Sequence, residues 1–315
     1  MSPSRASGVD LSRFAAALAE VRARRVGTVP CGPSPLLGDV VIALDTTGST
    51  QEDARDLVRS GVPHGTIVLA EQQTGGRGRR GRTWVSPPGT GIWATVILRR
   101  PLPDAAPQAL TLAAAVAVCE GARAGGAAVD IKWPNDIVAG GGPQSGSKVA
   151  GVLGEMLAAD RETVALLGLG VNYDWGAGAD PGRRAAGTVA DQPVTDLRAC
   201  GLDPGIGREE VLASITASLE DALFTAATGG LAAILDRWRP LSPSSAGRRV
   251  RVTPVDGDET PGERPAAAAT GTTKGIAADG SLLVEDDAGV VHIVRFGGTL
   301  RFEATERRNA DASDH

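Results

Sequence analysis

Short apolar runs separated by turn residues fill the chain from residue 39 onward. The first three are "DVVIALD" (39–45), "GTIVLAEQQ" (65–73) and "GIWATVILRR" (Gly91–Arg100). Runs of this length that are rich in β-branched residues predict buried strands. Between the first two runs, "STQEDARDLVRSG" opens with Ser49 and Thr50, either of which could serve as an N-cap, so this segment is predicted to be a helix.

Three longer segments have the periodicity of helices. They are a polar-to-apolar run at Asp10–Arg25, a strongly apolar run at Gln108–Gly125, and an amphipathic run at Gly207–Arg239. Three strand-like runs lie between the last two helices: "AVDIKWPNDIVA", "KVAGVLGEML" and "ETVALLGLGVNY". Because these runs follow one another with hairpin-length links, the pattern favours an α+β fold. We expect a mixed, largely antiparallel sheet with helices on one face.

After "RPLSPSSAG" the chain alternates strand and turn, which predicts a small separate β-barrel of roughly 50 to 60 residues. We expect a partly disordered lead-in at 1–38, a main domain at 39–241, the barrel at 242–303 and a disordered charged tail at 304–315. The polar, alanine-rich stretch at 256–269 interrupts the barrel, and we interpret it as a mobile hairpin insertion.

Composition narrows the function classes. The 315 residues carry a formal net charge of -5, which argues against a protein that coats nucleic acid. The three cysteines have neither zinc-ligand spacing nor a disulfide pattern. The longest apolar stretch, Ala109–Cys119, is shorter than the ~20 residues of a membrane span, so we expect a cytoplasmic protein. The first 35 residues are too few for a separate DNA-binding domain.

One local cluster of positive charge stands out in "EQQTGGRGRRGRTWVSP" (Glu71–Pro87), which has arginines at 77, 79, 80 and 82. Glycines allow backbone amides to approach a ligand closely, and the forked guanidinium groups suit phosphate or carboxylate oxygens. The segment lies between two strands and opens no helix, so the dinucleotide-binding interpretation of G-x-G-x-x-G does not apply. Taken alone, the loop could be an anion site or a solvated basic turn.

Four further segments extend the pattern: "GST" (Gly48–Thr50), "KWPND" (Lys132–Asp136), "KVAGVLGE" from Lys148, and "GLGVN" (Gly168–Asn172). In this order, and together with the arginine loop, they resemble the biotin protein ligases, or biotin-[acetyl-CoA carboxylase] ligases. The resemblance covers about residues 39–172. It implies a catalytic domain like that of the class II aminoacyl-tRNA synthetases, followed by a small SH3-like barrel that helps to receive the carrier protein and ATP.

The implied activity is the ATP- and Mg²⁺-dependent conversion of biotin to biotinoyl-5'-AMP, followed by transfer to a lysine of a biotin carboxyl carrier domain of acyl-CoA carboxylases. The residue types suit this chemistry, because arginine and lysine can hold two repelling anions together. No side-chain nucleophile is needed, since the substrate carboxylate attacks. We expect neither a DNA nor a membrane partner, and the sequence leaves monomer and homodimer both open.

The resemblance also assigns roles to single residues. Lys148 and Arg79 are the predicted catalytic residues, and Asp136 is a weaker candidate for orienting a lysine or holding Mg²⁺. Predicted biotin contacts are Ser49, Thr50, Gln51, Gln73, Arg77, Gly78, Arg79, Lys148, Gly151 and Gly168. Predicted nucleotide contacts are Arg79, Arg82, Trp84, Asn135 and Asn172. Without the resemblance, Ser49 or Thr50 could be only a helix cap, Trp84 a core residue and Lys148 a surface lysine.

Two departures from the family pattern and three rival functions accompany this interpretation. Gln51 stands where an asparagine is usual, and "GGR" replaces the commoner alanine-glycine-arginine. We expect the loop at 74–84 to be disordered when empty and to order over biotin and adenylate. The rivals are a lipoate or octanoate ligase of the same superfamily, a biotin-sensing DNA-binding repressor, and a non-catalytic biotin- or nucleotide-binding module.

Overall fold

The computed structural model describes residues 8–25, 36–99, 107–159, 162–176, 193–253, 269–296 and 299–302. The chain divides into two compact units. The first comprises residues 1–243 with 278–280, and the second comprises 244–277 with 281–315. Most of the predicted insertion at 256–269 and all of the predicted tail at 304–315 lie outside the described residues.

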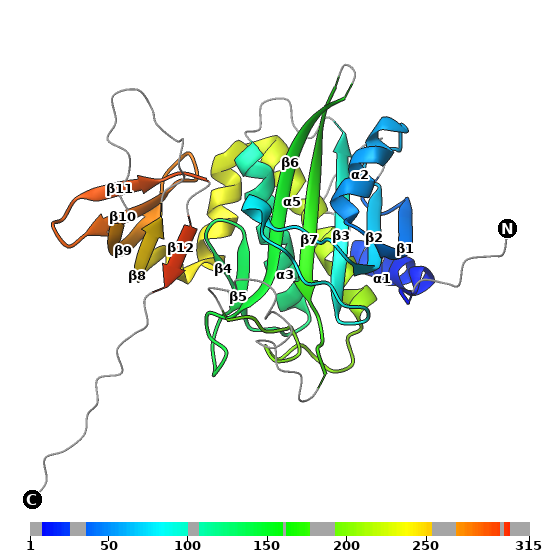
Figure 1. The fold of residues 1–315 in the computed structure, drawn as a ribbon, viewed down its shortest axis with the longest axis horizontal. Coiled ribbons are helices and arrows are strands. Elements are labelled where there is room, and N and C mark those ends of the chain that lie inside the picture. The colour runs from blue at the N-terminus through cyan, green and yellow to red at the C-terminus, as the bar shows by residue number, and fades with distance from the viewer. Residues whose placement is uncertain are drawn as a thin grey trace, which may run out of the picture. The chain divides into compact units, whose positions relative to one another are not determined.

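The described part of the first unit contains a seven-stranded sheet and four α-helices (Figure 1). The elements are α1 (Leu11–Arg24), β1 (Val41–Thr47), α2 (Thr50–Arg59), β2 (Ile67–Gln73), β3 (Gly91–Arg99), α3 (Pro107–Ala124), β4 (Val129–Lys132), β5 (Asp136–Ala139), β6 (Lys148–Ala159), β7 (Glu162–Asn172) and α5 (Arg208–Trp238). The strand order is β1-β2-β3-β7-β6-β5-β4. Only β1 and β2 pair in parallel, so the predicted mixed and largely antiparallel sheet is confirmed.

The sheet carries helices on both faces, so the prediction of helices on one face was wrong. Ala54 and Val58 of α2 pack in one cluster with Leu166 of β7. A Cβ built at Gly154 would instead meet Thr111 of α3 and Leu167 of β7. Since neighbouring strand residues point to opposite faces, α2 and α3 cover opposite sides of the sheet (Figure 1). The short polar α2 covers only one end of its face, which leaves the rest for a site.

Helices α3 and α5 pack closely, because α3 presents small residues where they meet. A Cβ at Gly121 would lie 2.7 Å from the backbone nitrogen of Ile215 in α5. Helix α1 lies on α5 and is held by ion pairs, including Arg25 with Asp221 at 2.8 Å. The described part of the predicted lead-in is therefore packed against the first unit. No helix in the described ranges has the length and apolar character needed to span a bilayer.

The segment "AVDIKWPNDIVA" was predicted as a single strand run, and the structure divides it into two strands. Strands β4 and β5 form an antiparallel hairpin, with Lys132 opposite Asp136 in the register. The peptide bond between Trp133 and Pro134 is cis, and the tight turn there separates the two strands. This turn brings Asn135 and Asp136 to the start of β5, beside β6.

The described residues of the second unit form a five-stranded antiparallel sheet in the order β11-β10-β9-β8-β12. Its strands are β8 (Ala246–Thr253), β9 (Ala269–Ile276), β10 (Leu282–Asp286), β11 (Val291–Val294) and β12 (Thr299–Phe302). Val250, Leu282 and Val284 are fully buried and form its small core. The predicted small C-terminal β unit is confirmed, whereas its SH3-like classification stays a prediction.

Candidate active site

The arginine loop has a definite backbone structure that begins where β2 ends. The amide of Gly78 donates to the carbonyl of Arg82 at 2.7 Å, and the amide of Trp84 donates to the carbonyl of Gly76 at 2.8 Å. A short 3-10 turn at Arg79–Gly81 closes this hairpin-like loop. Arg80 in this turn has a φ of 60°, in the left-handed region that favours glycine. Ordering of the loop by a ligand stays a prediction.

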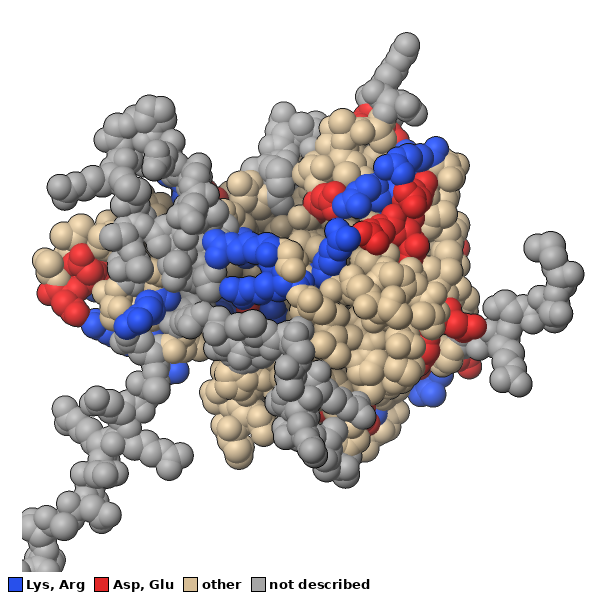
Figure 2. Space-filling model, viewed as in Figure 1, with Lys and Arg blue, Asp and Glu red and all other residues tan. Residues whose placement is uncertain are grey.

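The loop arginines point to different surroundings. Arg77 pairs with Glu52 of α2 at 2.5 Å and is exposed, as are Arg80 and Arg82. Arg79 is partly buried, and its Nη1 donates to Asn135 Oδ1 at 2.9 Å. Burial lowers the pKa of the Arg79 guanidinium from its usual value, because a charged group loses hydration there. In the space-filling view, Lys and Arg side chains extend from the middle of this face towards its upper right, with Asp and Glu side chains beside them (Figure 2).

Lys148 and Asp136 lie side by side at the start of β6 and β5. Lys148 Nζ is 2.6 Å from Asp136 Oδ1, and both side chains are about one-fifth exposed. Burial works against ionisation of Asp136, but the positive charges of Lys148, Lys132 and Arg79 outweigh it, so the pKa of the carboxyl is lowered. The cluster therefore holds an ionised carboxylate among three cations, which leaves a local excess of positive charge.

Trp84 lies over the sheet beside this cluster. Lys148 Nζ is 5.2 Å from the centre of the Trp84 ring, within the range of a cation–π contact. The ring lies directly on β7, since a Cβ at Gly170 would be only 2.7 Å from Trp84 Cε2. Gly151 on β6 is close to both residues, because its Cβ would lie 3.2 Å from Lys148 Nζ and 3.5 Å from Trp84 Cζ3. The Trp84 ring therefore packs against two glycines, Gly151 and Gly170.

A second group of polar side chains surrounds the start of α2. Ser49 is the N-cap residue, yet its side chain makes no capping hydrogen bond, so a capping role does not explain the serine. The backbone amide of Thr50 donates to Gln73 Oε1 at 2.9 Å. Gln73 Nε2 donates in turn to Ser86 Oγ at 2.9 Å. These contacts join the start of α2 to the end of β2 and to the segment after the arginine loop.

Gln51 is buried over β7 and bonds to two residues that sequence reasoning did not single out. Its Oε1 accepts from Thr95 Oγ1 at 3.2 Å, and its Nε2 donates to Glu155 Oε2 at 3.4 Å. A Cβ at Gly168 would lie 2.7 Å from Gln51 Oε1, so only glycine allows the longer amide to lie there. Gly78, by contrast, would meet nothing closer than 3.6 Å, so the described conformation does not require a glycine at that position.

Asn172 and Asn135 both use their amide nitrogens to bind backbone. Asn172 Nδ2 donates to the carbonyl of Thr195 at 2.9 Å, and Asn135 Nδ2 donates to the carbonyl of Val152 at 2.7 Å. The backbone of Lys148 lies beside the same segment, because its amide donates to the carbonyl of Pro193 at 2.7 Å. The described contacts thus give both asparagines a structural task, and Asn135 also accepts from Arg79.

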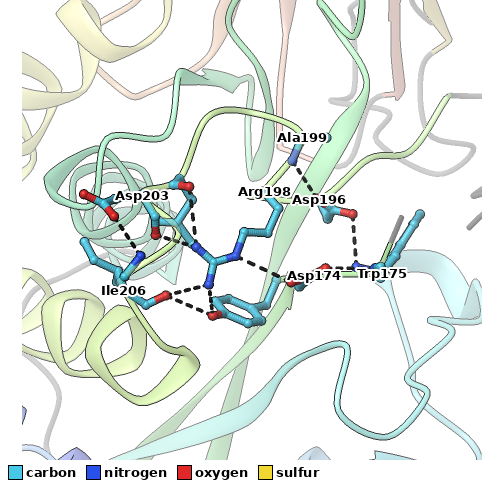
Figure 3. A network of polar contacts seen from close by, with 11 residues as sticks. Asp174, Trp175, Asp196, Arg198, Ala199, Asp203 and Ile206 are labelled. Carbon is cyan, nitrogen blue, oxygen red and sulfur yellow. Dashed lines mark hydrogen bonds and ion pairs between the residues drawn. The ribbon is translucent and has the colours of Figure 1, made fainter. Parts of the chain in front are cut away.

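A network centred on Arg198 fixes the chain that follows this segment (Figure 3). Its guanidinium donates to the carbonyl of Ile206 at 2.8 Å and also contacts the Tyr173 hydroxyl. The same guanidinium stacks over the Tyr173 ring at 4.9 Å and pairs with Asp174 at 3.5 Å. Tyr173 directly follows β7, so the network ties the end of this strand to the segment that runs beside Lys148.

The structure therefore brings many of the predicted residues together as two adjoining groups, whereas Arg77, Arg82 and Asn172 belong to neither. One is the charged group of Arg79, Asn135, Asp136 and Lys148 with Trp84, and the other is the polar group of Ser49, Thr50, Gln51 and Gln73. Sequence reasoning missed Thr95 and Glu155. A signal existed for both, because each is a polar residue within a strand that is otherwise mostly apolar.

Two roles were predicted for Asp136, orienting a lysine or holding Mg²⁺. Nowhere in the described ranges do three or more His, Cys, Asp or Glu side chains gather in a way that could hold a metal ion. The carboxylate of Asp136 is engaged by Lys148, and the surrounding charges are positive. Asp136 therefore contacts the lysine that it was predicted to orient, and both of its predicted roles stay predictions.

The sequence is similar to those of known ligases. Residues 44–172 match the biotin/lipoate A/B protein ligase family. The chain is 35% identical over 200 residues to a biotin--[acetyl-CoA-carboxylase] ligase of Paracoccus denitrificans, covering 62% of this chain and 78% of that protein. It is 43% identical over 141 residues to the bifunctional ligase/repressor BirA of Bacillus spizizenii, covering 44% of this chain but only 42% of the relative.

The fold is similar to that of a solved biotin protein ligase from Aquifex aeolicus in complex with biotin and ATP. The TM-score is 0.64 at 23% sequence identity, with 84% of this chain and 100% of the other covered. This likeness concerns the fold alone. Because its sequence matches most of the length of the Paracoccus ligase, the chain belongs to the biotin protein ligase family.

Proposed function

We propose that this protein uses ATP to activate biotin as biotinoyl-5'-AMP and then transfers the biotinoyl group to a lysine of a biotin carboxyl carrier domain. The observation that carries the proposal is that Arg79 and Lys148 lie in one charged group with Trp84. A cluster of buried amides and hydroxyls lies next to this group. Such a site has cations for the reacting anions, an aromatic face for a base, and hydrogen-bonding groups for a polar ring.

In the first step, a carboxylate oxygen of biotin attacks the α-phosphorus of ATP, and the bond to pyrophosphate breaks. Both reactants are anions, so they must be brought together against their repulsion. Lys148 carries a compact charge that can lie between the two groups, and Arg79 supplies a planar fork for the phosphate. Asp136 pairs with the Lys148 ammonium at 2.6 Å, which orients it before the substrates arrive.

In the second step, the amine of the carrier lysine attacks the acyl carbon, loses a proton, and displaces AMP. The chain needs no nucleophilic side chain of its own for either step. Trp84 would stack against the adenine and position the nucleotide, because its ring already packs closely on Gly170 and beside Gly151. Mg²⁺ would come with the ATP, whose phosphate oxygens are its preferred ligands, and not from a protein site.

The polar group favours biotin over lipoate or octanoate. Thr50, Gln51 and Thr95 are at least 94% buried and are linked by hydrogen bonds. A polar ring can form further hydrogen bonds with such groups, whereas an alkyl chain or dithiolane would form few. The ureido ring of biotin offers two N–H donors and a carbonyl acceptor, which match this environment. We accordingly propose biotin as the acid.

The test is mass spectrometry of an apo carrier domain of an acyl-CoA carboxylase after incubation with the protein, ATP, Mg²⁺ and biotin, with lipoate in a parallel reaction. We expect a gain of one biotinoyl group that requires ATP. Lys148→Met should slow adenylation, followed as pyrophosphate release, by about 10²- to 10³-fold, as for other groups that stabilise transition-state charge. Arg59→Met removes an exposed, ion-paired cation of α2 and serves as the charge-matched control.

The outcomes separate the rival functions. Transfer of lipoate without transfer of biotin would contradict the choice of acid. Absence of adenylation with either acid would contradict the enzymatic proposal and support a binding module. Equal effects of Lys148→Met and Arg59→Met would contradict the role of Lys148. Binding of DNA by this chain, measured over a series of salt concentrations, tests the repressor function in addition.

A further inference from the structure

An ion pair at the edge of the site connects to Thr50 through a chain of hydrogen bonds. Arg55 of α2 donates to both oxygens of Glu155 on β6, at 2.6 and 2.8 Å. Glu155 also accepts from Gln51 Nε2 at 3.4 Å. Beyond Gln51 the chain continues through Thr95 Oγ1 at 3.2 Å and from there to Thr50 Oγ1 at 2.9 Å.

The carboxylate decides the orientation of the Gln51 amide. An ionised carboxylate can only accept hydrogen bonds, so Nε2 must face Glu155 and Oε1 must face Thr95. Thr95 then gives its single hydroxyl proton to Gln51. With that proton committed, Thr95 Oγ1 can only accept from Thr50, and the Thr50–Thr95 contact of 2.9 Å suits this direction.

The other end of the chain is fixed by the backbone. The amide of Thr50 can only donate, so it holds Gln73 Oε1 towards α2 at 2.9 Å. Gln73 Oε1 also accepts from the Thr50 hydroxyl, at 3.2 Å, so this hydroxyl has two acceptors within reach, Gln73 Oε1 and Thr95 Oγ1. Because Thr95 gives its proton to Gln51, the shorter contact of 2.9 Å between the two threonines requires the Thr50 proton, and no other described residue donates to Thr50 Oγ1.

We propose that Arg55 and Glu155 are positioning residues that impose a one-way hydrogen-bond relay from Thr50 through Thr95 and Gln51 to Glu155, so that Thr50 Oγ1 acts as a hydrogen-bond acceptor for a ureido N–H of the bound acid. This inference rests on the proposed function. Donation in one direction towards an anion polarises each member of the chain, which strengthens Thr50 Oγ1 as an acceptor. Without Glu155 the Gln51 amide could rotate, and Thr95 would then donate to Thr50 and occupy one of its lone pairs.

The relay makes Glu155 a determinant of acid specificity without contact between Glu155 and the acid. An acid with an N–H donor gains from the acceptor at Thr50, whereas a dithiolane or alkyl acid does not. Gln51 is essential to the connection, since its longer side chain lies over Gly168 and so reaches both Thr95 and Glu155.

The test is a double-mutant cycle in which the affinity for biotin is measured by calorimetric titration without ATP. Glu155→Gln keeps the size of the side chain but removes the obligatory acceptor, and Thr95→Val cuts the relay in its middle. Each should weaken biotin binding by about 2- to 12-fold, the factor that one neutral hydrogen bond contributes. The double variant should bind like Thr95→Val alone, because Glu155 has no route to Thr50 once Thr95 lacks its hydroxyl.

A matched control is available in the same sheet. Arg99 of β3 pairs with Glu162 of β7, so Glu162→Gln removes the same charge from a similar pair. Glu162→Gln should leave the biotin affinity unchanged, and the KM for ATP should be the same in Glu155→Gln, Thr95→Val and Glu162→Gln as in the wild type. Unfolding temperatures identify a variant that loses affinity only through loss of structure.

Independent, additive effects of Glu155→Gln and Thr95→Val would overturn the relay, as would equal biotin affinities of Glu155→Gln and Glu162→Gln. If Glu155→Gln does not fold, Thr95→Val still decides, because unchanged biotin binding in that variant overturns the role of the Thr95 hydroxyl. Failure of the wild-type protein to bind biotin at all would overturn the proposed function first, and the inference with it.

Discussion

Substitution of Gly170 directly tests the close packing of the Trp84 ring on β7. In Gly170→Ala, the new methyl group would lie 2.7 Å from Trp84 Cε2 and 2.8 Å from Nε1. An ordinary contact is about 3.4 Å or more, so the ring would have to retreat by about 0.7 Å. Its other neighbours restrict this movement, because Trp93, which is fully buried, meets the ring edge-on at a centroid distance of 6.4 Å.

Two costs follow from this displacement. Overpacking of a fitted contact lowers the free energy of unfolding by about 1–3 kcal/mol. If Trp84 stacks on the adenine, losing that stack removes about 1–3 kcal/mol of binding, which corresponds to a rise in the KM for ATP of roughly 5- to 150-fold. The KM for biotin should change much less, since the hydrogen bonds described for Thr50, Gln51 and Gln73 do not involve the Trp84 ring.

The assay is pyrophosphate release at varied ATP and varied biotin, with thermal unfolding of the same preparations. Gly141→Ala is the control, because a Cβ at Gly141 would meet nothing within 4 Å. A KM for ATP within twofold of the wild type, in a Gly170→Ala protein of normal stability, would refute the assignment of Trp84 to the nucleotide. An equal rise in the KM for biotin would show that the ring serves the acid instead.

The remaining predictions concern the charged cluster and the cysteines. The pKa of Asp136 is lowered from 3.8 in the folded state, so its contribution to stability is present above about pH 4 and is lost as the pH falls through the folded pKa. The difference in unfolding free energy between wild type and Asp136→Asn should therefore shrink below pH 4, whereas a constant difference down to pH 2 would contradict the ion pairing. Asn135→Ala leaves the Val152 carbonyl and Arg79 without their partner and should cost about 1–3 kcal/mol in denaturant unfolding, and an effect under 0.5 kcal/mol would disprove this. Burial raises the pKa of Cys119 to about 12 and that of Cys200 to about 11, so neither thiol should react with a disulfide reagent at pH 8 before unfolding, and rapid labelling of either would contradict the packing.

The candidate site was largely predictable because its residues lie in short motifs whose chemistry is local. Arg79 in a glycine-rich loop and Lys148 at the start of a strand were predicted as site residues from the family resemblance, since taken alone they could also be a solvated turn and a surface lysine. The way these residues partner one another could not be predicted. Asn135 and Arg79 are 56 positions apart in the chain, and only the β4–β5 hairpin brings them within 2.9 Å.

Apart from the division of residues 129–139 into two strands, the sequence by itself determined the order of helices and strands, the sheet class, the second unit and the family. Hydrophobic periodicity and motifs are carried by neighbouring residues, which is why they can be read from the chain. Only the tertiary structure decided that α2 and α3 cover opposite faces, and that Gln51, Thr95 and Glu155 form one hydrogen-bonded chain. The reason is physical: these contacts join α2, β3 and β6 across a sheet whose strand order differs from the chain order. No pattern along the chain specifies which polar residues of distant strands will meet.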